Sequence, residues 1–212
     1  RIGLLPGQTN NAGPGANACS FPPGTGLFTT IEGPGILVAP MEGAFSAGRS
    51  ARIDGLTVTG SDQSAAILVN GYAHFLEIGN NVVTSNQGPA ASGIRVGHPT
   101  LLNGNGDTES AYNDNIYIHN NLVAQNGGLV EPGAGIGLYT GSDAYRVVDN
   151  FISGNFSQSD GAGIAHYGYS PGGLIADNDV VFNQGFDQTV AGGGNAGGIL
   201  IAGHEQDAAA AV

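Results

Sequence analysis

The chain has 212 residues, of which 38 are glycine, 41% are hydrophobic and 10% are charged, and its formal net charge is −12. This composition is too apolar for a disordered chain and too rich in glycine for a helical protein. The acidic charge argues against nucleic acid and anionic membranes as partners, and no apolar run of eighteen residues could form a membrane-spanning helix. We therefore expect an all-β protein in which glycine supports many tight turns.

The first fifty residues are rich in proline and glycine, so we expect residues 1–50 to cap or lead into a repetitive domain over 51–212. Cys19 is the only cysteine, which excludes a disulfide within the chain. Abundant Gly, Asn, Ser and Thr without any lysine favour an exported bacterial protein, secreted or at the cell surface. We also expect the chain to be a fragment of a longer one.

Short apolar triplets recur along the chain, each preceded by a small residue. They lie at 35–38 (GILV), 66–69 (AILV), 93–96 (GIRV), 135–138 (GIGL), 163–166 (GIAH) and 198–201 (GILI). A second apolar element follows at 76–78, 116–118, 145–147 and 174–175. The 28 residues from 135 to 163 fit one turn of a three-strand coil. In the first interval, the run at 53–60 predicts one strand and leaves little room for another.

Pairs of asparagines, five residues apart, bracket a further apolar run in four repeats. The pairs are Asn81 and Asn86, Asn121 and Asn126, Asn150 and Asn155, and Asn178 and Asn183. An Asn amide both donates and accepts, so stacked amides can pair with each other and with backbone groups at a turn. Asn also tolerates the left-handed backbone that a sharp corner requires. We interpret these eight residues as a structural ladder and not as catalytic groups.

The GIxV triplets, the asparagine turns and the variable loops beside the first strand together resemble the right-handed parallel β-helix of the pectin-lyase-like superfamily. The segment from about 53 to 204, with GIRVGHP, GIGLYTGSD and FISGNFSQSDGAGIAHYG, is similar to β-helix segments of large exported bacterial proteins whose function is mostly unassigned. The resemblance implies a solenoid of about five to six coils with three short strands per coil. It says little about activity.

The resemblance further implies that a ligand groove runs along the outer face of the first strand of each coil. Arg95 is the only arginine in that frame, and Tyr139 and Tyr167 take equivalent positions in consecutive coils. Arg95 is therefore a candidate catalytic base, and the two tyrosines are candidates for a platform on which a sugar stacks. Ordinary aromatic covering of a strand is the alternative interpretation of the tyrosines.

Three histidines lie at or just after the first strand. His166 falls in the inward frame that Val96 and Leu138 fill elsewhere, so it is either a hydrogen-bonded core residue, which we favour, or a general base. His98 and His204 follow the same strand in other coils and are candidate ligand-binding residues on loops. Surface placement without a function is the alternative for both.

Calcium is the one cofactor that the sequence leaves open. Polysaccharide lyases of this superfamily commonly hold calcium with clustered Asp residues beside a base, whereas the outer frame of the first strand carries no Asp here. Asp107 and Glu109, in the insertion 97–114, are the metal candidates, although their context matches no complete calcium loop. A glycosidase would need two carboxylates across a groove, and Asp143 and Asp160 are candidates whose separation the pattern does not define.

Two functions stay open on these grounds. We favour a non-enzymatic module of an exported protein that gives structural reach, adhesion or carbohydrate binding. The alternative is a polysaccharide lyase, hydrolase or epimerase with an atypical site on the first-strand face. The last coil, after Ile201, has no evident cap, so we expect further chain or a partner to cover its edge. A polysaccharide or another protein chain is the expected partner.

Overall fold

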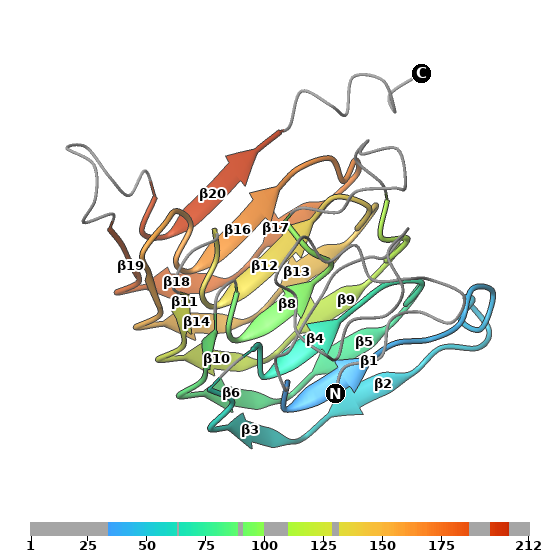
Figure 1. Ribbon diagram of the computed structural model, residues 1–212, viewed down its shortest axis with the longest axis horizontal. Coiled ribbons are helices and arrows are strands. Elements are labelled where there is room, and N and C mark those ends of the chain that lie inside the picture. The colour runs from blue at the N-terminus through green and yellow to red at the C-terminus, as the bar shows by residue number, and fades with distance from the viewer. Residues whose placement is uncertain are drawn as a thin grey trace, which may run out of the picture.

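The computed structural model describes residues 34–62, 64–88, 91–99, 110–128, 132–186 and 196–203. Twenty short strands and no helix lie within these ranges, and the strands of neighbouring coils pair in parallel (Figure 1). They stack into four sheets along the axis of a solenoid, from the blue first coil to the red last strand in Figure 1. The prediction of an all-β parallel β-helix is therefore confirmed.

Each sheet collects one strand from each coil that contributes to it. The first sheet contains β1 (Ile36–Val38), β4 (Ile67–Val69), β8 (Ile94–Val96), β12 (Ile136–Tyr139), β16 (Ile164–Tyr167) and β20 (Ile199–Ala202). The second contains β2 (Arg52–Asp54), β5 (Glu77–Gly79), β9 (Tyr117–His119), β13 (Arg146–Val148) and β17 (Leu174–Ala176). The third contains β3 (Thr57–Thr59), β6 (Val82–Thr84), β10 (Leu122–Ala124), β14 (Phe151–Ser153) and β18 (Asp179–Val181). The fourth contains β7 (Gln87–Gly88), β11 (Gly127–Gly128), β15 (Phe156–Ser157) and β19 (Gln184–Gly185).

The repeat correctly predicts three strands per coil but not the short strands of the fourth sheet, which have two residues each. Two residues are too few to show a periodic pattern in the sequence. The first interval holds both β2 and β3, because only Gly55 and Leu56 separate them. The segment 1–50, expected as a cap, contains β1, whose pairing with β4 places it in the first coil. Residues 1–33 lie outside the described ranges.

Inward side chains stack into aliphatic columns that fill the solenoid. In the first sheet, the register aligns Ile67, Ile94, Ile136 and Ile164, none of which has exposed surface. The middle residue of each strand in the second and third sheets extends the same core. Apolar burial contributes about 25 cal/mol per Å², so these columns supply the main stabilising contribution.

The paired asparagines form two ladders, at the corners before the third and the fourth sheets. The Nδ2 atom of Asn121 donates to Oδ1 of Asn150 and to the backbone oxygen of Ile78, both at 2.9 Å. Its Oδ1 accepts from the backbone N and from Nδ2 of Asn81, both at 3.0 Å. The second ladder repeats these bonds one corner later. The predicted Asn ladder is confirmed.

The left-handed backbone at these corners belongs to the residue before each ladder asparagine. Asn80, Asn120, Asp149 and Asp177 have φ angles between 52° and 56°, whereas no ladder asparagine has a positive φ. Asn and Asp adopt this conformation more readily than other residues with a side chain. The expectation that the ladder asparagines themselves take it is therefore wrong. Asp149 and Asp177 do occupy the same corner position as Asn80 and Asn120 in their coils.

Three glycines that come just before first-sheet strands, Gly93, Gly135 and Gly163, lie where the next coil approaches closely. A Cβ atom on Gly135 would lie 2.5 Å from the carbonyl oxygen of Gly163 and 3.0 Å from Nδ2 of Asn155. A Cβ atom on Gly163 would meet the carbonyl oxygen of Gly198 at 2.5 Å. These glycines therefore allow the coils to stack closely beside the second ladder.

Candidate functional site

Arg95 and Tyr139 lie on the outer side of the first sheet but are buried. Arg95 is 1% exposed and Tyr139 has no exposed surface. The Nε atom of Arg95 donates to the backbone oxygen of Gly97 at 3.3 Å, and the Tyr139 hydroxyl donates to the backbone oxygen of Pro132 at 2.6 Å. The expectation that these two side chains line an open groove is therefore wrong.

Neighbouring loops cover the outer side of the first sheet and explain this burial. A Cβ atom on Gly133, in the loop before β12, would lie 3.3 Å from the Cβ atoms of both Ala91 and Ala165. Nearer the N-terminus, Leu68 on β4 also points outward, yet it is fully buried in a small apolar cluster that includes Ala111. The covering residues come from loops that do not repeat, so the strand pattern could not predict them.

The other predicted site residues fall into two groups. Tyr167 pairs in register with Tyr139, as the sequence predicts. Tyr167 and His98 are both half-buried. The metal candidates Asp107 and Glu109 and the loop residue His204 lie outside the described residues, and their roles stay predictions.

His166 has two hydrogen-bond partners at the end of β16. Its Nδ1 lies 2.7 Å from the hydroxyl of Tyr145, and its Nε2 lies 3.2 Å from the carbonyl oxygen of Gly168. Because a carbonyl oxygen only accepts, Nε2 carries the proton and Nδ1 accepts from the hydroxyl. Burial lowers the pKa of His166 and raises the pKa of Tyr145 to about 12, which keeps both groups neutral near pH 7. This geometry supports a hydrogen-bonded core histidine over a general base.

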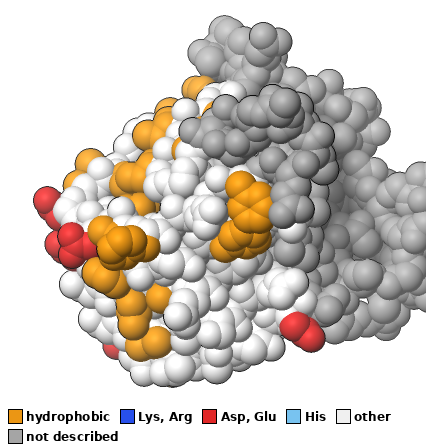
Figure 2. Space-filling model, turned by 90° about the vertical axis from the view of Figure 1, so that its left-hand side faces the viewer, with side chains coloured by type: hydrophobic (Ala, Val, Ile, Leu, Met, Phe, Trp, Pro, Cys, Tyr) orange, Lys and Arg blue, Asp and Glu red, His pale blue; other side chains and the backbone are white. Residues whose placement is uncertain are grey.

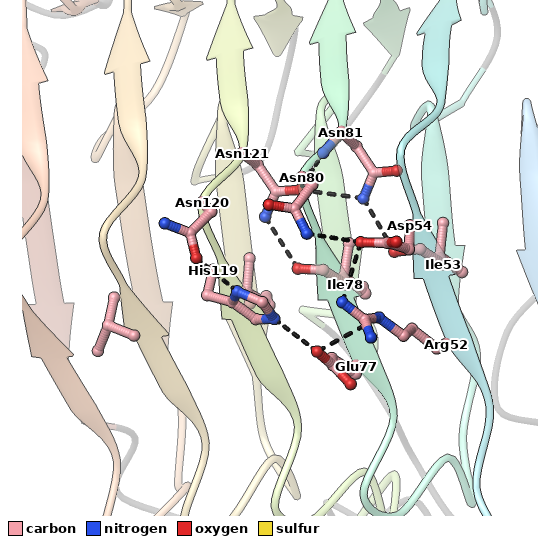
Figure 3. A network of polar contacts seen from close by, with 12 residues as sticks. Arg52, Ile53, Asp54, Glu77, Ile78, Asn80, Asn81, His119, Asn120 and Asn121 are labelled. Carbon is pink, nitrogen blue, oxygen red and sulfur yellow. Dashed lines mark hydrogen bonds and ion pairs between the residues drawn. The ribbon is translucent and has the colours of Figure 1, made fainter.

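The outer side of the second sheet carries a network of charged side chains (Figure 3). The Oε1 atom of Glu77 lies 2.7 Å from Nε2 of His119 and 3.4 Å from Nε of Arg52. Arg52 also pairs with Asp54 at 3.1 Å, and the hydrogen bond from Asn80, together with Arg52, lowers the pKa of Asp54. Both carboxylates already have partners within the protein. The network therefore links neighbouring coils and does not present an unengaged base.

Gly79 makes room for the histidine of this network. A Cβ atom at that position would lie 2.7 Å from Cε1 and Nε2 of His119. The imidazole also stacks on Tyr117, with centroids 4.1 Å apart, and the guanidinium carbon of Arg146 lies 5.6 Å from the Tyr117 ring centroid. These contacts extend the network across the coils of β5, β9 and β13.

A second column of titratable groups lies at the corner after the first sheet. The Nδ1 atom of His74 is 3.1 Å from Oδ2 of Asp114, and the backbone N of Asp143 donates to Oδ1 of Asp114 at 3.3 Å. Burial and, to a smaller extent, the charge of Asp114 raise the pKa of Asp143. Within the described ranges, no group of three or more His, Cys, Asp or Glu side chains is arranged to hold a metal ion. The column therefore places two carboxylates in neighbouring coils without forming a metal site.

A hollow of about 370 Å³ opens at the corner between the third and fourth sheets, and we call it the corner hollow. Its lining residues come from three coils: Ser85, Asn86, Gln87, Gln125, Asn126, Gly127, Gly154 and Phe156. The space exists because Gly127 and Gly154 leave gaps on the surface. A Cβ atom at either position would come no closer than 3.8 Å to a neighbouring side chain. Figure 2 views this side of the solenoid, where hydrophobic patches lie among mostly uncharged atoms.

The described residues that line the corner hollow are aromatic, polar or glycine, and none of them has a titratable side chain. Phe156 supplies a ring that packs against Phe186, with centroids 4.6 Å apart. The exposed Gln87 and Gln125 supply amide donors and acceptors, and Ser85 supplies a hydroxyl. An aromatic face beside neutral hydrogen-bonding groups suits a sugar ring. The arrangement supports binding and offers no acid or base for catalysis.

The ladder register contains a signal for this site. It aligns Gln87, Gly127, Phe156 and Gln184 in one outer column of the fourth sheet. A glycine between two larger outward side chains marks a gap in such a column. None of these residues is among those predicted from the sequence, because the prediction followed the first-strand face.

No protein-family model, curated protein or solved structure matches the chain. Across the ranges that the structure describes, there is no helix long and apolar enough to cross a membrane.

Proposed function

We propose that this chain is a carbohydrate-binding module of an exported bacterial protein, built on a pectin-lyase-like β-helix and without catalytic activity of its own. The observation that carries the proposal is the corner hollow, which Phe156, Gln87 and Gln125 help to line and whose described lining includes no titratable group. A sugar ring would stack on Phe156 and exchange hydrogen bonds with the two glutamine amides.

The positions of the titratable groups favour binding over catalysis. Glycoside hydrolysis generally uses two carboxylates that flank the scissile bond, and calcium-assisted elimination uses clustered acidic ligands beside a base. The Glu77–His119 network lies on the second sheet, and Asp114 and Asp143 lie at the corner after the first sheet. Neither group lines the corner hollow. The burial of Arg95 and Tyr139 weakens the alternative of an atypical catalytic site on the first-strand face.

Export and the pectin-lyase-like relationship form part of the proposal. Export is supported by the absence of lysine and the abundance of Gly, Asn, Ser and Thr. The relationship is supported by the GIxV triplets and by the asparagine ladders, which resemble those of that superfamily. A rigid solenoid with a coil spacing of ~4.8 Å also suits a polysaccharide, because both are linear repeats.

A glycan array probed with the full chain, with and without calcium, tests the proposal. We expect binding to neutral glycans, with loss of binding in Phe156→Ala and in Gly127→Leu, whose new side chain fills the corner hollow. Thr57→Ala, on the outer side of the third sheet, is the control that should bind like the unchanged chain. Any bound glycan is then incubated with the protein and its products are analysed. Absence of binding, or the appearance of shortened or unsaturated sugars, would contradict the proposal.

A further inference from the structure

We infer that the ligand of the corner hollow is an uncharged polysaccharide that lies along the solenoid axis and continues from the hollow onto Phe182. This inference rests on the proposed function. It adds the charge class of the ligand, its direction on the surface and a second aromatic contact.

Phe182 is an aromatic residue whose exposure gives it little part in the core. Its side chain is 92% exposed, and its backbone is left-handed with a φ of 57°. This conformation disfavours bulky side chains, and an exposed ring gains no burial energy in return. The equivalent residue one coil earlier is Gly154, which takes the same conformation without strain. Phe182 differs from the other left-handed aromatic residues in being almost fully exposed, which leaves its ring accessible to a ligand.

Phe182 belongs to the column of corner residues that runs through the corner hollow. The register aligns it with Ser85, Gln125 and Gly154, all of which line the hollow. The backbone N of Gly154 donates to the carbonyl oxygen of Val181, the residue just before Phe182. Neighbouring coils are ~4.8 Å apart, so Phe182 stands one coil beyond the gap at Gly154. A ligand that fills the hollow and continues toward the C-terminal coils reaches this ring next.

The acidic charge of the protein disfavours acidic ligands and so favours an uncharged one. Among the described residues that line the hollow there is no arginine to attract a polyuronate and no carboxylate to hold a bridging cation, and the net charge of −12 repels an acidic chain. The amides of Gln87 and Gln125 instead match the hydroxyl groups of a neutral sugar. The corner column repeats at the coil spacing of ~4.8 Å along the axis, which favours an extended chain that follows it.

Titration of the full chain with hexasaccharides and disaccharides of β-1,4-linked glucose, mannose and xylose tests this inference, with hexagalacturonate as the acidic probe. We expect at least one neutral hexasaccharide to bind more tightly than its disaccharide, without dependence on calcium and with little dependence on salt. We expect no binding of hexagalacturonate, with or without calcium.

Two variants separate the hollow from the second contact. Phe182→Ala should weaken binding of the hexasaccharide by about threefold to tenfold and leave the affinity for the disaccharide unchanged. Phe156→Ala should weaken binding of both sugars. Phe75→Ala is the matched control, because Phe75 is also exposed and left-handed (φ 59°) but lies at another corner. It should change neither affinity.

The outcomes distinguish this inference from the proposed function. Preferred binding of hexagalacturonate overturns the uncharged ligand but leaves a carbohydrate-binding module. A hexasaccharide that binds no better than its disaccharide, or a preference that survives Phe182→Ala, overturns the second contact. Absence of binding by every sugar overturns both proposals.

Discussion

The Nδ2 atom of Asn126 donates a hydrogen bond to Oδ1 of Asn155 at 2.9 Å, and each asparagine is followed directly by a residue of the corner hollow, Gly127 or Phe156. The bond that holds two coils in register therefore also holds the gap at Gly127 beside the ring of Phe156. Stability and the shape of the corner hollow therefore depend on the same ladder.

Removal of one inner rung should destabilise the whole solenoid. Asn126→Ala removes donors to Asn155 and to the backbone oxygen of Val83, and the acceptor for Asn86. We expect the free energy of unfolding to fall by about 2–4 kcal/mol, because buried groups lose their partners. Urea denaturation measures the change. Asn183 forms the last described rung of this ladder and is half-buried, so Asn183→Ala should lower the free energy of unfolding by less. An equal loss in both variants would argue against the ladder as the source of the effect.

The glycine ahead of β12 should not tolerate a side chain. Gly135→Ala puts a Cβ atom 2.5 Å from the carbonyl oxygen of Gly163, so the coils must move apart. We expect a loss of about 1–3 kcal/mol, as for other overpacked sites. Gly48→Ala is the control, because a Cβ atom there meets nothing within 4 Å. Thermal or urea unfolding of both variants provides the comparison, and equal stabilities would refute the close approach of the coils.

Stability should fall below pH 6.5 because of His166. Burial lowers its folded-state pKa below the ordinary value of 6.5. As the pH falls from 6.5 through the folded-state pKa, the unfolded chain binds a proton that the folded chain does not, and this contribution to stability is lost. Above pH 6.5 the contribution is fully present.

The double variant Tyr145→Phe with His166→Leu isolates this effect, because it removes both partners of the hydrogen bond together. Urea midpoints at pH 7 and pH 5 should differ less in the double variant than in the unchanged chain. The same difference in both proteins would show that another group causes the pH dependence.

Phe182→Gly should stabilise the protein and weaken the binding of long glycans. Relief of the left-handed strain contributes about 1–2 kcal/mol, and the greater freedom of glycine in the unfolded chain offsets roughly half of it. Ala144→Gly, at another exposed left-handed position (φ 52°), should stabilise similarly without any effect on binding. Unfolding and glycan titrations on both variants test this. A loss of stability in Phe182→Gly alone would show that the ring has a structural role.

The register of the solenoid could be predicted because its determinants are buried and recur in each coil. Asn81 and Asn121 must satisfy the same backbone groups in the same corner, so their spacing is visible in the sequence. The apolar triplets follow the same logic, since each contributes to the first sheet. The strands of the fourth sheet escaped prediction because strands such as Gly127–Gly128 offer no periodicity and no apolar side chain.

The candidate site could not be predicted in the same way. Arg95 and Tyr139 lie on the outer side of the first sheet but are buried, and the loop residue Pro132 accepts a hydrogen bond from the Tyr139 hydroxyl. Such loops do not follow the repeat. The corner hollow arises from what is missing from two columns, at Gly127 and Gly154. A prediction that searches for chemical groups overlooks a site made by absent side chains.

The central claim is that a glycan occupies the corner hollow, and NMR titration of the isotope-labelled chain with the tightest-binding neutral hexasaccharide tests it most directly. We predict that the side-chain amide signals of Gln87 and Gln125 and the backbone signal of Gly127 shift together as the sugar is added. Shifts confined to the first-strand face, at Tyr167 and His98, would contradict the claim.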